Sequence, residues 1–232
     1  MKTERRIGFF ENPLMSVTEN YTGKIRFNHS HKVFTDKDQW TPLHFAAQNG
    51  DDRTIRLLLE KGAAADVRDK AGWMPLHLAC QNGHETVVRL LLSRMSEDAI
   101  INQVEEEGRT PLHIACSYGH VNIAKLLIGR GVDLNAMDYS FSTALHLAAE
   151  QGHNRVVRLL LTKEVKTDIS DIKRYTPLHL ASESEVVVKL LAAKADPNVK
   201  EESDGWTPLH LACASLGFPC CDILYQHVEG FC

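Results

Sequence analysis

The sequence has no long apolar run and no strong excess of charge of either sign. Its 232 residues include 26 Lys and Arg against 30 Asp and Glu, a formal net charge of −4 at pH 7. No segment approaches the roughly 20 apolar residues of a membrane-spanning helix, and the start of the chain leads into no apolar stretch typical of a secretory signal. The small acidic excess provides no phosphate-binding field. We therefore expect a cytoplasmic protein, with the nucleus as an alternative location, that spans no membrane and binds no nucleic acid.

The short motifs of common catalytic sites are also missing. The chain contains no G-x-x-x-x-G-K-[ST], no kinase glycine-rich loop and no H-E-x-x-H. Cys80, Cys116 and Cys213 share one slot of a repeated pattern, which predicts small buried core residues in a reducing compartment. The cysteines near the C-terminus, with His227, lack the usual spacing of zinc ligands and are interpreted as free thiols of a tail. We expect no enzyme activity, no cofactor and no metal.

What the sequence does contain is a repeated tetrapeptide, Thr-Pro-Leu-His or a one-residue variant of it. The tetrapeptide occurs six times, and the second residues of successive copies lie 33, 36, 33, 33 and 31 residues apart. These second residues are Pro42, Pro75, Pro111, Ala144, Pro177 and Pro208. Thr is a favourable N-cap, because its hydroxyl can accept a backbone N–H of the first turn, and Pro suits the next position. Each copy therefore predicts the start of a helix. The small residues that follow, such as Ala46 and Ala47, would let neighbouring helices approach closely.

A second helix is expected after each first one. Most repeats have a Gly-containing break, such as Asn82-Gly83-His84, which is typical of a left-handed helix C-cap. Apolar residues then recur at helical spacing around one basic residue per repeat, which should face solvent. These basic residues are Arg56, Arg89, Lys125, Arg158 and Lys189. The fifth repeat lacks the Gly-His break, so its turn should be tighter.

The tetrapeptide at a period near 33 residues resembles the ankyrin repeat. The resemblance implies an all-α solenoid of about six helix-turn-helix repeats joined by hairpin-like loops. It also implies that the tetrapeptide histidines tie neighbouring loops together by hydrogen bonds. We expect residues 1–35 to be a flexible linker or tail and residues 36–232 to form one ankyrin-repeat domain whose last repeat is incomplete.

A narrower resemblance concerns one branch of this family. The segment from Val33 to Asp51 is similar to the first ankyrin repeat of the ankyrin-bearing receptor-interacting serine/threonine kinases, and the segments 72–79 and 108–115 continue the likeness. The resemblance implies an interaction module of intracellular signalling, because this sequence has no kinase motifs to carry catalysis. The alternative is an ankyrin-containing fragment or isoform of such a kinase.

The residues just before the tetrapeptides are candidates for binding a protein partner. All three tryptophans lie there, and aromatic residues and Arg are enriched in binding hot spots. The alternative is that each ring packs on the adjacent loop stem. On the first helices, exposed polar ends should line a concave, mildly acidic groove that favours basic or amide groups. The candidates are Trp40, Trp73, Arg109, Phe141, Tyr175, Trp206, Gln48, Gln81, Tyr118 and Glu150. We expect the protein to act as a monomer.

Two asparagines form a separate hypothesis. Asn135 and Asn198 resemble loop asparagines that are hydroxylated in many ankyrin proteins. The alternative is that Asn is present there because it adopts turn conformations readily.

Overall fold

The computed structural model describes residues 35–96, 104–163, 165–215 and 223–226. The chain divides into two units, Met1–Phe34 and Thr35–Cys232, and the description concerns the second. The expected tail, the C-terminal cysteines and His227 lie outside the described residues, apart from Thr35. So do residues 97–103 in the loop after the second repeat.

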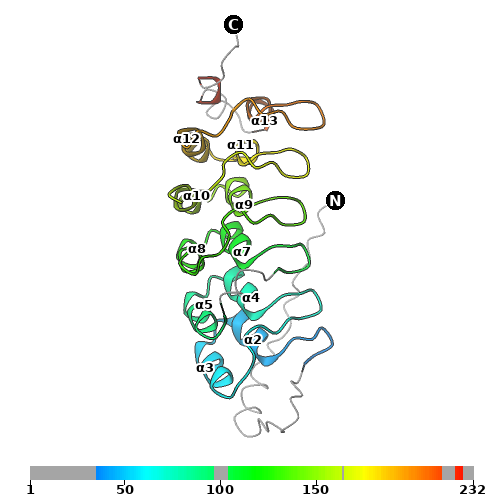
Figure 1. The fold of residues 1–232 in the computed structure, drawn as a ribbon, viewed down its shortest axis with the longest axis vertical. Helices are drawn as coiled ribbons and strands as arrows, with labels where there is room; N and C mark the ends of the chain where they lie inside the picture. The colour runs from blue at the N-terminus through cyan, green and yellow to red at the C-terminus, as the bar shows by residue number, and fades with distance from the viewer. Residues whose placement is uncertain (1–34, 97–103, 164, 216–222, 227–232) are drawn as a thin grey trace. The chain divides into compact units, whose positions relative to one another are not determined.

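The described residues form pairs of antiparallel helices and contain no β-strand. The inner helix of each pair starts at the second residue of a tetrapeptide, as predicted: α2 (Pro42–Asn49), α4 (Pro75–Gln81), α7 (Pro111–Ser117), α9 (Ala144–Glu150), α11 (Pro177–Leu180) and α13 (Pro208–Ser215). The outer helices are α3 (Asp52–Glu60), α5 (Glu85–Leu92), α8 (Val121–Ile128), α10 (Asn154–Leu161) and α12 (Ser184–Ala192). Figure 1 shows the inner helices stacked in one layer and the outer helices in a second, with the connecting loops projecting from the inner layer.

Small residues allow the inner helices to stack closely. Ala47, Cys80, Cys116 and Ala149 are each fully buried, and burial raises the pKa of both thiols. Cys213 was expected in the same core, but it is exposed. It lies on α13, the last inner helix of the described residues, and none of those residues forms a further inner helix to cover it.

The basic residues of the outer helices largely face solvent, as expected. Arg56, Arg89, Lys125 and Arg158 are exposed. Lys189 is the exception, because its side chain is only 20% exposed. Its ammonium group is held against the Glu185 carboxylate and donates to Asn154 Oδ1 at 3.2 Å.

Each tetrapeptide histidine contacts its own helix start, and four of the six also connect it to the next repeat. Its Nδ1 accepts the backbone N–H of the residue three positions earlier, at 3.1–3.2 Å. That contact requires an unprotonated Nδ1, so the ring proton of the neutral imidazole is on Nε2. In four repeats Nε2 then donates to a backbone carbonyl of the next loop at 3.1–3.3 Å, from His44, His113, His146 and His179 to Trp73, Ser142, Tyr175 and Trp206.

The N-cap threonines contact the first turn in two ways. The closest partner of the hydroxyl is the histidine Nδ1, at 2.8–2.9 Å in five repeats. Thr41, Thr110, Thr143 and Thr176 also form capping boxes with the third helical residue, and Thr110 accepts the His113 N–H at 3.4 Å. The threonine therefore stabilises the helix start by orienting the imidazole as well as by capping.

A second set of histidines ties each inner–outer turn to the preceding repeat. His84, His120 and His153 contact the backbone carbonyls of Gln48, Gln81 and Ser117 through Nε2, at 2.9–3.0 Å. Each ring lies on the turn glycine of that preceding repeat. A Cβ added to Gly83, for example, would be 2.6 Å from the His120 ring.

The fifth repeat departs from this arrangement. Its inner helix α11 has only 4 residues and is followed by Ala181 in an extended conformation. Without a Gly-His break, Glu183 instead of a histidine lies against Gly152, and Ser182 N donates to Ala149 O at 3.3 Å. The turn is shorter, as the sequence predicts.

The turn glycines provide a direct test of this packing. Gly83 and Gly131 both have a φ of +76°, but nothing lies within 4 Å of a Cβ added to Gly131. The left-handed conformation penalises Ala equally at both positions. We therefore expect Gly83→Ala to lower the free energy of unfolding by about 1–2 kcal/mol more than Gly131→Ala does, because the methyl group would displace the His120 ring. Chemical denaturation of the two variants measures the difference, and equal losses would contradict the packing role.

The histidine ties also predict a pH dependence of stability. Burial lowers the pKa of His44, His113, His146 and His179 in the folded state. Below about pH 6.5 the unfolded chain binds protons that the folded state does not bind, so stability must fall as the pH falls. Each histidine that titrates in this way contributes up to about 1.4 kcal/mol per pH unit. Urea unfolding between pH 7.5 and pH 5, a range above that in which carboxylates titrate, should show the decrease in stability. A free energy of unfolding that stays constant over this range would contradict neutral imidazoles in the folded state.

Candidate functional site

The loops between repeats are built around a carboxylate at the start of each. In four loops one Asp oxygen accepts two backbone N–H groups, two and four residues later, at 2.8–2.9 Å. These residues are Asp36, Asp69, Asp138 and Asp171. Glu105 and Glu201 replace Asp in the other two loops. Glu201 accepts N–H groups of Ser203, Trp206 and Asp204, which lower its pKa to about 2.

Neighbouring loops are joined near their tips by backbone hydrogen bonds. The donors and acceptors are Lys70 N to Asp38 O at 3.1 Å, Glu106 N to Ala71 O at 2.8 Å, Tyr139 N to Glu107 O at 3.0 Å, Ile172 N to Ser140 O at 2.9 Å and Glu202 N to Lys173 O at 3.2 Å. Each tip is therefore held in register with the next. Side chains on consecutive tips form one surface.

The aromatic residues before the tetrapeptides are partly occupied by packing. The rings of Trp40, Trp73, Tyr175 and Trp206 lie 5.7–6.4 Å from the imidazole of their own repeat. Trp40 Nε1 also donates to Asp69 Oδ2 of the next loop at 2.8 Å. All but Trp206 are half-buried. The expected alternative, packing on the loop stems, thus describes much of what these rings do.

Arg109 is also held within its own loop region. Its guanidinium pairs with the buried Glu105 and with Glu107, both at 3.1 Å. It lies 5.9 Å from the centroid of the Trp73 ring, a cation–π distance. Arg109 is therefore half-buried, and two carboxylates and an aromatic ring hold its side chain in place.

Phe141 is different from the other candidates. It is 50% exposed and has a φ of +59°, in the left-handed region that favours glycine. The equivalent positions of three other loops are Gly72, Gly108 and Gly205, all with positive φ. A left-handed conformation disfavours a non-glycine residue by roughly 1–2 kcal/mol, and a bulky one is an outlier. The exposed aromatic ring is therefore maintained at a cost that glycine would avoid.

The candidates on the inner helices lie at or just after the helix ends. Gln48, Tyr118 and Glu150 are exposed, whereas Gln81 is half-buried. Gln81 Nε2 donates to Tyr118 Oη at 2.9 Å, so these two side chains join neighbouring repeats. The structure places these four side chains at the turns between inner and outer helices, and the aromatic candidates on the loops between repeats.

The two asparagines lie in the loop segments that precede the carboxylate turns. Asn135 is half-buried, and its Oδ1 accepts the backbone N–H of Lys166 at 2.9 Å. Asn198 is exposed, and its N–H donates to Asp196 Oδ1 at 2.8 Å. Hydroxylation of either residue stays a prediction.

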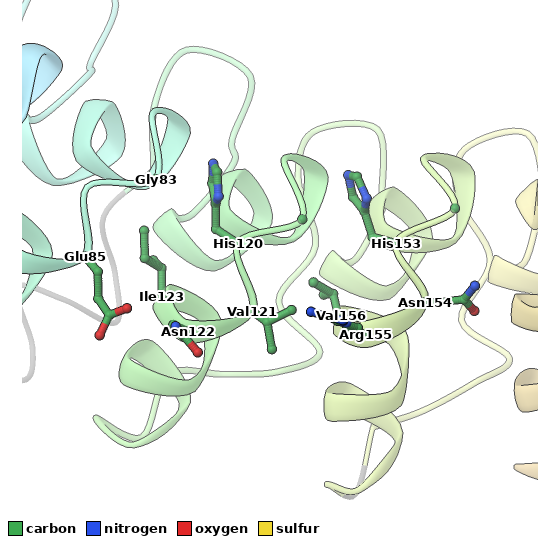
Figure 2. A pocket seen from close by; sticks show the side chains of 12 residues that line it. Gly83, Glu85, His120, Val121, Asn122, Ile123, His153, Asn154, Arg155 and Val156 are labelled. Atoms are coloured by element: carbon green, nitrogen blue, oxygen red, sulfur yellow. The ribbon is translucent and has the colours of Figure 1, made fainter.

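The described surface has a depression at the inner–outer turns, with a volume of about 480 Å³, and a second one of about 460 Å³ between the ends of α3 and α5. Figure 2 shows that the lining of the first depression comes from successive turns, with Glu85, Asn122 and Arg155 among its polar side chains. The His120 and His153 rings at its edge already contact backbone carbonyls. No group of three or more His, Cys, Asp or Glu side chains in the described residues is placed to hold a metal ion. The first depression therefore presents polar surface without a catalytic constellation.

The sequence analysis missed two exposed apolar residues at the loop tips. Tyr139 is 70% exposed and Ile172 is 57% exposed. Both occupy the position four residues before the tetrapeptide, where the first three loops carry charged side chains: Lys37, Lys70 and Glu106. Aligning the repeats on the tetrapeptide would have identified them.

Comparison with protein families agrees with this geometry. The family model for ankyrin repeats matches residues 14–102, 43–138, 94–171 and 145–231. The chain therefore belongs to the ankyrin-repeat family, whose repeats are protein–protein interaction modules. A comparison with curated proteins gave no match. No helix among the described residues is long and apolar enough to cross a bilayer.

The packing of Trp73 generates a prediction about stability. Its ring contacts both the His77 imidazole and the Arg109 guanidinium. Trp73→Ala should therefore lower Tm by about 2–4 °C, the shift that corresponds to roughly 1 kcal/mol in a domain of this size. Met137→Ala, which shortens a loop side chain that is 51% exposed, should leave Tm within about 1–2 °C. Thermal unfolding of both variants measures the difference, and an unchanged Tm for Trp73→Ala would leave the ring without a structural role.

Proposed function

We propose that residues 35–232 act as a non-catalytic scaffold that binds a protein partner through the loop tips and the adjoining ends of the inner helices. The observation that carries the proposal is the exposure of large side chains on this side, namely Phe141, Tyr139 and Tyr118. The backbone hydrogen bonds between the tips hold this surface in a fixed order before a partner arrives. Such preorganisation reduces the ordering that binding requires.

The outer helices are a less suitable binding surface. Their exposed residues include several basic side chains, and Arg89 and the largely buried Lys189 are paired with acidic side chains one turn earlier. Isolated exposed ion pairs of this kind contribute little to binding or stability. The formal net charge of −4 also favours a protein partner over a nucleic acid.

A finer part of the proposal concerns the cellular role. The likeness of the segment from Val33 to Asp51 to receptor-interacting kinases supports a scaffold of intracellular signalling that acts as a monomer in the cytoplasm or nucleus. The second candidate, an ankyrin-containing part of such a kinase, rests on the same likeness. The length of the endogenous protein on a denaturing gel separates the two candidates, since an additional kinase domain would raise the mass well above the 26.0 kDa of this chain.

The binding surface can be tested by photo-crosslinking in cells. A photoreactive phenylalanine analogue placed at Gln48 or Tyr118 should form crosslinks to a partner, because both positions are exposed at the ends of the inner helices. The same analogue at Arg89 or Arg158, exposed on the outer helices, is the matched control and should form few. Crosslinks from the outer helices alone would assign binding to the opposite side of the module.

A further inference from the structure

Tyr139, Phe141 and Ile172 form an exposed apolar patch across two loops. The Tyr139 ring lies over Gly108 of the third loop, where an added Cβ would be 2.6 Å from Cδ1. Ile172 occupies the equivalent position one repeat later, and its N–H donates at 2.9 Å to the carbonyl of Ser140, the residue between Tyr139 and Phe141. The three side chains therefore belong to one continuous stretch of the loop surface, which we call the tip patch.

The tip patch differs from the other aromatic candidates because none of its side chains packs on a tetrapeptide imidazole. The rings of Trp40, Trp73 and Tyr175 cover the tetrapeptide imidazoles, whereas Phe141 has no such contact and keeps a left-handed backbone conformation. The left-handed conformation is common to this loop position, since Gln39 and Arg174 also adopt it, but Phe141 alone places an aromatic ring there. Exposed large apolar side chains on neighbouring tips are typical of a surface that contacts a partner.

Charges of opposite sign flank the tip patch. Glu106 and Glu107 are exposed on the third loop, and Lys173 and Arg174 are exposed on the fifth. A partner that crosses the loops in order thus meets an acidic loop, then the apolar patch, then a basic loop. Such an order suits a segment with the reverse charges, basic at one end and acidic at the other.

The repeat spacing sets the spacing of the partner's side chains. Packed helices lie about 8–10 Å apart, and the loops that extend from them are held in register. An extended chain advances about 3.3 Å per residue, so one repeat corresponds to about three residues. We infer that the tip patch binds an extended protein segment with a large apolar residue, a basic residue about three positions to one side and an acidic residue about three positions to the other.

This inference rests on the proposed function, and it can be tested with defined peptides. Random 16-residue peptides displayed on phage are selected on the full 232-residue chain, and the enriched sequences are synthesised. We expect the basic–apolar–acidic spacing among them, in either chain direction. Enriched peptides without this pattern, or no enriched peptide, would overturn the inference. Crosslinks to a cellular partner from Gln48 or Tyr118 would in that case leave the proposed function standing.

The decisive variant is Phe141→Gly, which supplies the residue that three other loops have at this position. It should weaken the selected peptide by about 30-fold, as expected for a hot-spot residue. It should also raise Tm by about 2 °C, because the backbone strain is relieved. Gln39→Gly is the matched control, since Gln39 has a φ of +65° at the same position of the first loop. It should raise Tm similarly and change the affinity for the selected peptide less than about twofold, as expected for a substitution outside the binding site.

Each result for Phe141→Gly supports or overturns the tip patch. A lower Tm would make Phe141 a packing residue, and unchanged affinity would place the peptide elsewhere.

A charge exchange tests the charged residues that flank the tip patch in the same way. Lys173→Glu should weaken the peptide by about tenfold, and replacing the acidic residue of the peptide by Lys should restore binding to this variant. If the exchanged peptide binds the variant no better than the original peptide does, the flanking charges do not set the partner's chemistry.

Discussion

The fold depends on a backbone carbonyl that receives two hydrogen bonds. The carbonyl of Trp73 accepts the N–H of Asp69 in its own loop at 2.9 Å and His44 Nε2 of the preceding repeat at 3.1 Å. The first bond closes the loop, and the second fixes that loop to the previous helix pair. Histidine suits this position because one rigid ring provides an acceptor and a donor at opposite corners when it is neutral. Because the connection repeats, the loop tips acquire a fixed order that no single repeat could impose.

Much of this architecture could be predicted from the sequence, because helix starts and close packing depend on residues near one another in the chain. The positions of proline and of small residues predict the inner helices, and the helical spacing of apolar residues predicts the outer helices. Other features depended on contacts between repeats. Cys213 occupies the same slot as Cys80 yet is exposed, since what covers that slot is the next inner helix. The burial of Lys189 likewise depends on Asn154, in the repeat before it.

The candidate site shows the same division between local and non-local information. Residue type and position before the tetrapeptides identify the aromatic candidates, but neither shows that the rings of Trp40 and Tyr175 stack on imidazoles. Nor could a motif reveal the left-handed conformation of Phe141, because the sequence gives glycine there in only three of the loops. Comparing equivalent positions among the repeats separates the two kinds of aromatic residue. Side chains that the fold uses recur with the motif, whereas Tyr139 and Ile172 interrupt a charged pattern.

The tip patch lies where the helix layers are connected least regularly. Between the fourth and fifth repeats, no histidine lies on Gly152, and α11 is reduced to one turn. The loop side keeps both of its connections at this boundary: His146 reaches the Tyr175 carbonyl, and Ile172 N donates to Ser140 O. Irregularity in the turns therefore does not reach the loops, because each edge of the stack has its own hydrogen bonds. A surface formed by consecutive loop tips can therefore keep its geometry while the turns between inner and outer helices vary. A preformed binding site needs this constant geometry.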